Sequence, residues 1–359
     1  MKLLMGDSGK KATAVLAVAF FTLYLLIVVG CGNGTGEGNG KAIKSNPQPA
    51  TSGNTWTNTN GGVSSLAIQS LAYDSGHNLL YGGANGQGAW KYDSTTWTDI
   101  SGGVSSFTVF TLAYDSGHNF LYAGCYDPAS RTGKGVWKYD GTTWTDTGGG
   151  VSSYEIDSIA YDSGHNLLYA GTYGQGVWKY DGTTWTDTGG GVSSDYIRSL
   201  AYDSGHNLLY AGCWDTSIHK SKGVWKYNGT TWTDTAGGVS RYQINSLACD
   251  SGHNLLYAGT YLKGVWKYDG TTWTDTAGGV SSYTIRSLAY DSGRNLLYAG
   301  TYGKGVWNYD GTTWTDTDGG VSSYQIDSLA CDSGHNLLYA SCYDPSTNTG
   351  KGVWKYEGH

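Results

Sequence analysis

The chain of 359 residues has little charge and lacks the motifs of several enzyme classes. Only 14% of its residues are charged, and the formal net charge is −7. A mildly acidic chain is a poor partner for nucleic acid or anionic lipid, because both favour clustered positive charge. The sequence contains no G-x-S-x-G, no glycine-rich phosphate loop and no Cys/His metal spacing. These absences argue against nucleic-acid binding and against catalysis, and they give no reason to expect a cofactor or a metal.

What the chain does contain is one phrase repeated seven times. Glycine (57), tyrosine (30) and tryptophan (15) are abundant, and the repeat region shows no helical period. Sequences close to S-L-A-Y-D-S-G-H-N-L-L-Y-A-G recur at intervals of 41 or 47 residues, with the aspartate at Asp74, Asp115, Asp162, Asp203, Asp250, Asp291 and Asp332. A period in the forties that is filled with short β-rich runs is typical of a β-propeller.

Each repeat predicts four short strands. In the third copy we expect them at Ile156–Asp162, Asn166–Thr172, Val177–Tyr180 and Thr183–Asp187. Runs of four to seven residues that are rich in Val, Ile, Tyr, Trp and Thr, with glycine-containing turns between them, are strand signals. Four strands in each of seven repeats make an all-β fold.

The two ends of the array predict that the ring is closed. The last copy stops after its third strand, Val353–Tyr356, whereas an isolated strand-like segment, Thr55–Thr57, precedes the first copy. Third-strand and fourth-strand tryptophans number seven each only if this N-terminal strand completes the C-terminal blade. Such closure hides the edge strands of the ring. The sequence therefore predicts a seven-bladed β-propeller of four-stranded blades over residues 55–359.

The turn before the fourth strand typically reads D-G-T-T-W, as at Asp140–Trp144. This motif resembles the Asp-box of sialidase-like and related BNR-repeat propellers, which lies at the same place in a blade; the family pattern, D-x-G-x-T-W, is one residue longer. The resemblance implies a propeller fold. Sialidases use a cluster of arginines with a tyrosine and acids, whereas this chain has five arginines in all.

The N-terminus resembles an export signal of the bacterial lipoprotein type. Lys2, Lys10 and Lys11 precede an apolar run that ends Val28-Val29-Gly30-Cys31. The resemblance implies a signal peptide over residues 1–30 and lipidation of Cys31. The composition of residues 31–54, which is rich in Gly, Asn, Ser and Pro, predicts a flexible tether. An uncleaved membrane helix is the alternative, since the run is long enough to span a bilayer. Both interpretations place the repeats outside the cytoplasm.

Most repeated polar and aromatic residues are expected to be structural. Six histidines and one arginine occupy the turn after the first strand and are predicted to bond locally, because turns at the rim of a ring do not converge on one ion. The strand tryptophans are predicted to pack between blades. Five cysteines beyond Cys31 are interpreted as small buried residues without disulfide bridges: Cys125, Cys213, Cys249, Cys331 and Cys342.

A specific site is expected where the copies differ. The residue before the constant Ser/Thr of the first strand varies, and first strands should line the central channel. Three connections on the same face are six residues longer: Asp127–Lys134, Asp215–Lys222 and Asp344–Lys351. Trp214, directly before the second of them, is interpreted as a loop residue. Polar groups around a concave opening predict a binding site. The candidate ligand-binding residues are Gln69, Asp157, Arg198, Trp214, Asn245, Arg286 and Asp327; Phe110 holds the equivalent place in the second repeat.

Three hypotheses of function follow. The first is an exported, lipid-anchored, monomeric scaffold of the bacterial cell envelope that binds a glycan or a protein and performs no catalysis. The second is a glycosidase or lyase that acts on polysaccharide, although Asp157 and Asp327, three blades apart, are expected to exceed the separation of about 5–9.5 Å between glycosidase carboxylates. The third is a structural repeat protein of the envelope with no small ligand.

Overall fold

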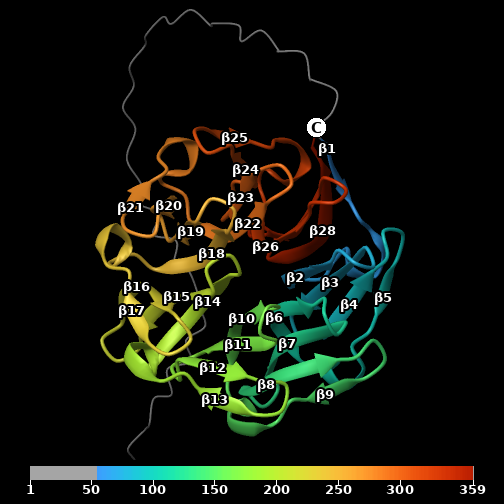
Figure 1. Ribbon diagram of the computed structural model, residues 1–359. Coiled ribbons are helices and arrows are strands. Elements are labelled where there is room, and N and C mark those ends of the chain that lie inside the picture. The colour runs from blue at the N-terminus through green and yellow to red at the C-terminus, as the bar shows by residue number, and fades with distance from the viewer. Residues whose placement is uncertain (1–54, 359) are drawn as a thin grey trace, which may run out of the picture. The chain divides into compact units, whose positions relative to one another are not determined.

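A computed structural model describes residues 55–358, and within this range the chain forms seven four-stranded antiparallel sheets (Figure 1). The seven sheets belong to one compact unit of the chain. The signal peptide, the tether and the lipidated Cys31 expected from the sequence lie outside the described residues. Within residues 55–358, no helix has the length and apolar character that a membrane crossing requires.

Each sheet is one blade, and the sheet order follows the chain except in the last blade. From inner to outer strand, blade 1 contains β2 (Ile68–Asp74), β3 (Leu79–Ala84), β4 (Ala89–Tyr92) and β5 (Trp97–Asp99); blade 2 contains β6 (Thr108–Asp115), β7 (Phe120–Asp127), β8 (Thr132–Tyr139) and β9 (Trp144–Asp146); blade 3 contains β10 (Ile156–Asp162), β11 (Leu167–Thr172), β12 (Val177–Tyr180) and β13 (Trp185–Asp187). Blade 4 contains β14 (Asp195–Asp203), β15 (Leu208–Asp215), β16 (Lys220–Tyr227) and β17 (Trp232–Asp234); blade 5 contains β18 (Ile244–Asp250), β19 (Leu255–Thr260), β20 (Val265–Tyr268) and β21 (Trp273–Asp275); blade 6 contains β22 (Ile285–Asp291), β23 (Leu296–Thr301), β24 (Val306–Tyr309) and β25 (Trp314–Asp316). Blade 7 contains β26 (Gln325–Asp332), β27 (Leu337–Asp344), β28 (Thr349–Glu357) and β1 (Thr55–Asn58).

The predicted closure of the ring is confirmed in blade 7. Strand β1 pairs antiparallel with β28, and Trp56 lies opposite Tyr356 with ring centroids 5.0 Å apart. The first and last blades are also joined at the inner strands, where the Leu71 amide donates a hydrogen bond of 2.9 Å to Oγ of Ser328. The N-terminal strand is therefore the outer strand of the last blade (Figure 1).

A short 3₁₀ helix of sequence Gly-Gly-Val connects each outer strand to the next blade. Its second glycine is required by packing: a Cβ on Gly62 would lie 2.7 Å from Cζ3 of Trp90. The sequence shows no helical period here, because a helix of three residues is too short to produce one. The seven helices are η1 (Gly61–Val63), η2 (Gly102–Val104), η3 (Gly149–Val151), η4 (Gly190–Val192), η5 (Gly237–Val239), η6 (Gly278–Val280) and η7 (Gly319–Val321).

The hydrophobic core lies between neighbouring blades. One cluster, for example, joins Tyr122 of blade 2 to Ile156, Leu168 and Trp185 of blade 3. The outer-strand tryptophans bridge blades as predicted, since Nε1 of Trp185 donates to the hydroxyl of Thr147, which follows the outer strand of blade 2. The blades are thus held to one another by repeated contacts around the ring.

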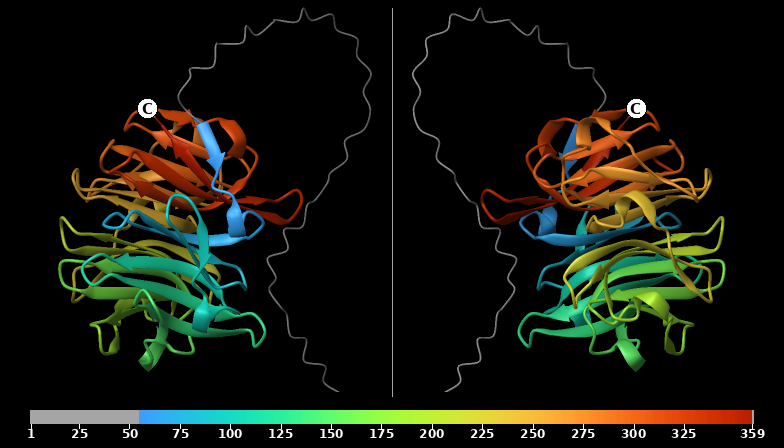
Figure 2. Two further views of the ribbon diagram at one scale, coloured as in Figure 1. Left: turned by 90° about the vertical axis from the view of Figure 1, so that its right-hand side faces the viewer. Right: turned by 90° about the vertical axis from the view of Figure 1, so that its left-hand side faces the viewer.

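The two faces of the ring receive different connections. The turns between first and second and between third and fourth strands lie on one face, which we call the turn face. The hairpins between second and third strands, and the Gly-Gly-Val helices, lie on the other, which we call the hairpin face. Figure 2 shows the β7–β8 and β27–β28 hairpins projecting on the same side of the ring.

The prediction that the three long connections are loops is wrong. The extra residues lengthen both strands of each hairpin, so that turns of only four residues remain, at 128–131, 216–219 and 345–348. Trp214 consequently lies inside β15, where it is paired with Tyr196 of β14 and Ser221 of β16. Pairing within the hairpin satisfies backbone groups that a long loop would leave to solvent.

Candidate functional site

The variable residue of every first strand lies in a β-bulge. In each blade the pairing register between the first and second strands shifts at this residue, so that it has no partner in the ladder. A bulge bends the strand and redirects a side chain, and bulges are frequent beside functional sites. The seven bulged residues are Gln69, Phe110, Asp157, Arg198, Asn245, Arg286 and Asp327.

Four bulged residues from consecutive blades line one cavity. Asp157, Arg198, Asn245 and Arg286 of blades 3 to 6, together with Tyr196, surround a cavity of about 130 Å³. Because each first strand begins on the hairpin face and contacts the first strands of both neighbouring blades, this cavity lies at the mouth of the central channel on that face. We call it the mouth cavity. It is lined by groups of both charge signs.

The two arginines of the mouth cavity differ in their partners. Nη2 of Arg286 is 2.6 Å from Oδ1 of Asp327, so the charge of Arg286 is largely neutralised. The guanidinium of Arg198 lies over the ring of Tyr196, with its Cζ 5.1 Å from the ring centroid. No ion pair of Arg198 occurs within residues 55–358. Arg198 is therefore the cation of this cavity that is available to a ligand.

Asp157 is held in an unfavourable environment for a carboxylate. Burial, followed by the negative charge of Glu155, raises its pKa to about 7, although Arg198 and the Tyr196 hydroxyl favour the charged form. The residue is partly exposed, but its Oδ2 is shielded from solvent and accepts no hydrogen bond from any group described in the structure. An unpartnered buried acceptor is costly, and a ligand donor could relieve that cost.

The remaining predicted site residues lie elsewhere. Gln69 occupies the bulge of blade 1 but does not line the mouth cavity, and Trp214 lies in the hairpin of blade 4 beside Tyr196. Asp327 is engaged by Arg286 and by Nε2 of Gln325, 2.6 Å away. The structure thus brings four of the seven candidate residues to one cavity, and a fifth, Asp327, forms an ion pair with Arg286 of that cavity.

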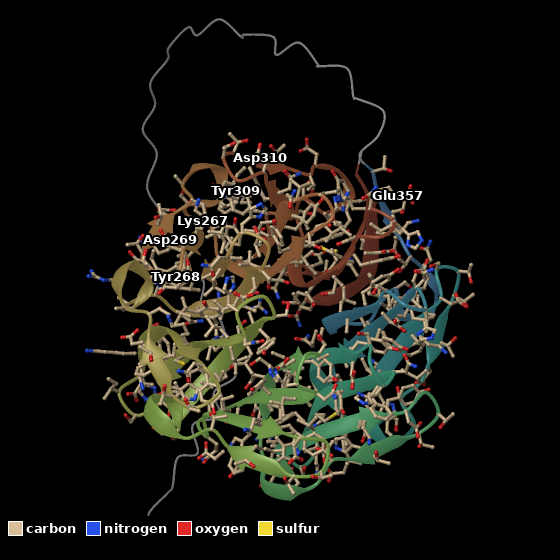
Figure 3. All side chains as sticks on the ribbon, viewed as in Figure 1. Lys267, Tyr268, Asp269, Tyr309, Asp310 and Glu357 are labelled. Atoms are coloured by element: carbon tan, nitrogen blue, oxygen red, sulfur yellow. The ribbon has the colours of Figure 1, made fainter. Side chains whose placement is uncertain are left out.

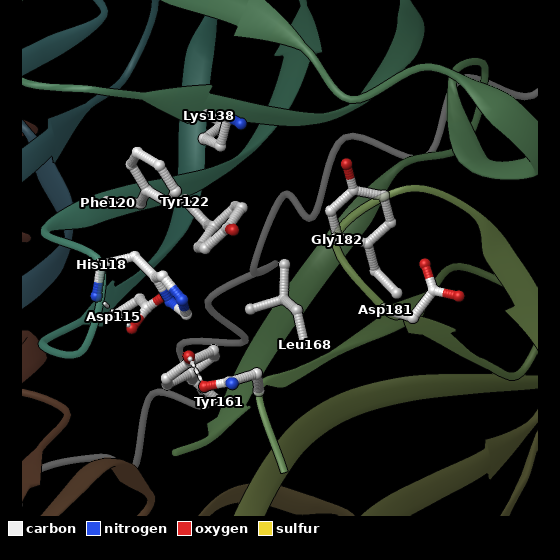
Figure 4. A pocket seen from close by; sticks show the side chains of 11 residues that line it. Asp115, His118, Phe120, Tyr122, Lys138, Tyr161, Leu168, Asp181 and Gly182 are labelled. Atoms are coloured by element: carbon white, nitrogen blue, oxygen red, sulfur yellow. Dashed lines mark hydrogen bonds and ion pairs between the residues drawn. The ribbon is translucent and has the colours of Figure 1, made fainter. Parts of the chain in front are cut away.

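Sequence reasoning missed a second kind of site, on the turn face. Two grooves between blades are lined by residues that the repeats share. The larger, about 300 Å³, lies between blades 3 and 4, and the other, about 230 Å³, lies between blades 2 and 3 (Figure 4). In the groove between blades 2 and 3, one wall is formed by His118, Phe120 and Lys138 of blade 2. The opposite wall is formed by Tyr161, Asn166 and Asp181 of blade 3. The signal was present as constant residues of the repeat, but a groove between two blades is visible only when the blades are placed side by side.

The turn histidines bond locally, as predicted, but to a side chain. Nδ1 of His118 is 2.8 Å from Oδ2 of Asp115, whose Oδ1 accepts the backbone amides of Gly117 and His118. The same pair recurs in five other blades, and in blade 6 Arg294 donates from Nε to Asp291 at 2.7 Å. Within residues 55–358, no three His, Cys, Asp or Glu side chains are grouped so that they could hold a metal ion.

The cysteines of the repeats are free thiols in the described part of the chain. Cys125, Cys213 and Cys342 are buried, as expected, and Cys249 and Cys331 are partly buried. Burial raises the pKa of all five thiols. A raised pKa keeps a thiol protonated and weakly reactive, so these side chains serve packing.

Comparisons with known proteins show the fold. No protein-family model and no curated protein sequence matches the chain. Two similar solved structures are described as the extracellular domain of BT4673 from B. thetaiotaomicron, assigned in one case to a one-component and in the other to a hybrid two-component system. They share 19% and 18% of residues with this chain, each at a TM-score of 0.63 and over 84% of this chain. This chain spans 39% of the length of those chains, and at this identity the likeness concerns the fold alone.

Proposed function

We propose that the protein is an exported propeller of the cell envelope, anchored through a lipid on Cys31, that binds an acidic glycan at the mouth cavity. The observation that carries the proposal is the convergence of Asp157, Arg198, Asn245 and Arg286, which vary among otherwise similar blades, on one cavity. The structural neighbours are described as extracellular domains, which agrees with an exported domain.

The chemistry of the cavity favours a carboxylate on a sugar. Arg198 has its guanidinium free for a bidentate hydrogen bond with a carboxylate, the pairing for which this group is best suited. Tyr196 is in contact with Tyr173, ring centroids 4.6 Å apart, and Tyr173 is 56% exposed. Exposed aromatic rings present the apolar face and polar edge that a sugar ring requires. Asn245 adds an amide beside the arginines.

Binding to polygalacturonate, alginate and hyaluronan, with dextran as the neutral comparison, tests the proposal. Arg198→Ala should weaken binding of an acidic polymer about ten-fold or more, since hydrogen bonds to charged groups contribute about 1.5–3 kcal/mol. Arg241→Ala is the matched control, because Arg241 is exposed in a connection on the same face but does not line the cavity. Equal losses in both variants, or binding to none of the acidic polymers, would contradict the proposal and favour a structural role.

One observation supports a second candidate, an enzyme that acts on polysaccharide. A proton donor or acceptor is most effective when its pKa lies near the working pH, and the pKa of Asp157 is about 7. The second acid expected for a glycosidase, Asp327, is instead bound by Arg286. Asp157→Asn separates the two candidates: an enzyme would lose polymer cleavage while keeping binding, whereas a binding protein shows no cleavage in either form.

A further inference from the structure

Residues that line the turn-face grooves recur in the sequence at other junctions between blades. The His–Asp turn and the tyrosine of the next first strand line both described grooves, and a third-strand lysine lines the groove between blades 2 and 3. The same residue types stand at the junctions of blades 1/2, 5/6 and 7/1. At those three junctions the histidines are His77, His253 and His335, the lysines are Lys91, Lys267 and Lys355, and the tyrosines are Tyr114, Tyr290 and Tyr73. Figure 3 labels Lys267, Tyr309 and Asp310, the counterparts at junction 5/6 of Lys138, Tyr180 and Asp181.

Two junctions depart from this pattern. At junction 4/5 Cys249 stands in place of the tyrosine, and at junction 6/7 Cys331 does so. At junction 6/7 Arg294 also replaces the histidine: its guanidinium lies over the ring of Tyr298, with Cζ 5.6 Å from the centroid, and Nη1 donates to the Gly358 carbonyl at 3.5 Å. Arg294 thus occupies the place that the tyrosine takes elsewhere, for example Tyr202 stacked on Tyr169.

The groove between blades 2 and 3 combines an apolar floor with a polar rim. Phe120, Tyr122 and Leu168 supply the apolar surface, and the ammonium of Lys138 lies 4.6 Å from the centroid of the Phe120 ring. His118 points its ring toward this space with Nδ1 held by Asp115, as Figure 4 shows, so that Nε2 is the nitrogen free to bond a ligand.

Neither groove has an excess of positive charge, because Asp115 also lines the groove between blades 2 and 3 and Asp162 lines the groove between blades 3 and 4 without a lysine, and this argues against an anionic ligand. Lys138 faces Asp181 across the groove between blades 2 and 3, and the groove between blades 3 and 4 has the neutral Asn228 in place of Asp181. At about 230 and 300 Å³ the cavities lie at or below the lower end of the range for small-molecule sites, about 300–1,000 Å³. A compact neutral ligand with one apolar face and several hydroxyl groups fits this lining.

We infer that the two described grooves and the three junctions with the same residues are equivalent binding sites for neutral sugar rings, which makes the turn face a multivalent surface for a glycan polymer. This inference concerns a different face from the mouth cavity and does not depend on it. Each single site binds weakly, because a groove of this size makes few contacts. Engagement of several grooves by one polymer raises the overall affinity by about 10²–10⁴-fold.

Histidine footprinting tests all junctions in one sample. Diethyl pyrocarbonate modifies the free Nε2 of exposed histidines, and the side chains of the five groove histidines are 49–60% exposed. Modification is measured by mass spectrometry with high concentrations of D-glucose, D-galactose, D-mannose or N-acetylglucosamine, with sorbitol as the open-chain comparison. His219, exposed in the β15–β16 hairpin on the opposite face, is the control within the same chain.

We expect at least one of the four sugars to protect His77, His118, His165, His253 and His335 together, with modification falling by about half when the sugar concentration equals the dissociation constant. His219 should be unaffected. Lys138→Ala should reduce the protection of His118 and leave that of His165 unchanged, because Lys138 lines only the groove of His118. Protection by none of the sugars, equal protection by sorbitol, or an equal change at His219 would overturn the inference. Loss of acidic-polymer binding in Arg198→Ala would remain a separate result that concerns the mouth cavity alone.

Discussion

At the mouth of the channel, equivalent positions of four blades carry Asp157, Arg198, Asn245 and Arg286, whereas on the turn face most blades carry the same aspartate, histidine and lysine. The difference has a structural origin. A bulged residue has no partner in the strand ladder, so its side chain can change without loss of a backbone hydrogen bond. The aspartate of each turn instead holds the turn together by hydrogen bonds: Asp115, for example, accepts hydrogen bonds from Gly117 and His118.

This comparison assigns different uses to the two faces. At the mouth cavity, bulged residues of four blades meet, and these residues differ from blade to blade. A site built from different side chains suits a single specific ligand. Repetition on the turn face multiplies one weak site around the ring, and it suits a repeating ligand. The two faces share the same strands, so any change that opens the ring should affect both.

The largest effect is expected from opening the ring. Deletion of residues 55–60 removes β1, which contributes Trp56, 7% exposed and hydrogen-bonded to Thr317. Truncation of one buried tryptophan alone costs about 3–5 kcal/mol, and the deletion also exposes the edge of β28. We expect a large drop of the melting temperature by calorimetry and loss of ligand binding at both faces.

Deletion of residues 49–54, which leaves β1 in place, is the control and should melt like the parent. If the chain without residues 55–60 melted at the temperature of the parent, the closing role of β1 would be wrong. If it lost binding at only one face, the faces would not depend on a common ring.

A smaller effect is expected at Asp157 and depends on pH. Its pKa is raised to about 7 in the folded protein, so the folded state binds more protons than the unfolded state between about pH 4 and pH 7. The free energy of unfolding therefore falls as the pH rises through this range, and the full penalty is present above it. Asp157→Asn should raise the melting temperature by at least about 2 °C at pH 8. At pH 4 the variant and the parent should melt alike.

The control for this prediction is Asp140→Asn. Asp140 lies in an exposed turn, and hydrogen bonds from Thr143 and Thr142 lower its pKa. The contribution of Asp140 to the free energy of unfolding therefore has the opposite sign to that of Asp157. A carboxyl group with a lowered pKa stabilises the folded state at pH values above the ordinary pKa of aspartate. Asp140→Asn should not raise stability at pH 8. A variant of Asp157 that was no more stable at pH 8 than at pH 4, relative to the parent, would show that the carboxylate is adequately solvated.

Much of the fold could be predicted from the sequence. Strands β10 and β12 have the predicted bounds, and the displaced strand at Thr55–Asn58 completes the last blade. Repetition made this possible, because seven copies of one pattern reveal which positions are strand and which are turn. The bulges were not predicted, since a shift of pairing register depends on the partner strand and leaves no mark in the first strand alone.

The candidate sites were only partly predictable, for a related reason. The variable positions pointed to Asp157 and Arg198, but the pairing of Arg286 with Asp327 arises between blades. Trp214 was misplaced because the inserted residues extend a hairpin, in which backbone groups pair with each other. The grooves of the turn face consist of constant residues, which variation among copies cannot single out.

The smallest effect is expected at the junctions of the turn face that lack the first-strand tyrosine. At four junctions the tyrosine of the first strand stacks on a tyrosine of the preceding blade, as in Tyr81 and Tyr114, with centroids 5.7 Å apart. Cys249 lies beside Tyr210 without such a ring. Cys249→Tyr should therefore add a stacked pair and stabilise the fold by about 0.5–1.5 kcal/mol. A rise of the melting temperature in calorimetry checks this.

Cys331→Tyr is the matched variant, because at junction 6/7 another side chain already fills the space that the new tyrosine ring would take. Arg294 lies over Tyr298 there, and a second large side chain would overpack the junction at a cost of about 1–3 kcal/mol. The single variant should melt below the parent, and Arg294→His in the same chain should restore the loss, because histidine leaves the stacking place open in five other junctions. Equal effects of Cys249→Tyr and Cys331→Tyr would show that Arg294 does not occupy the groove.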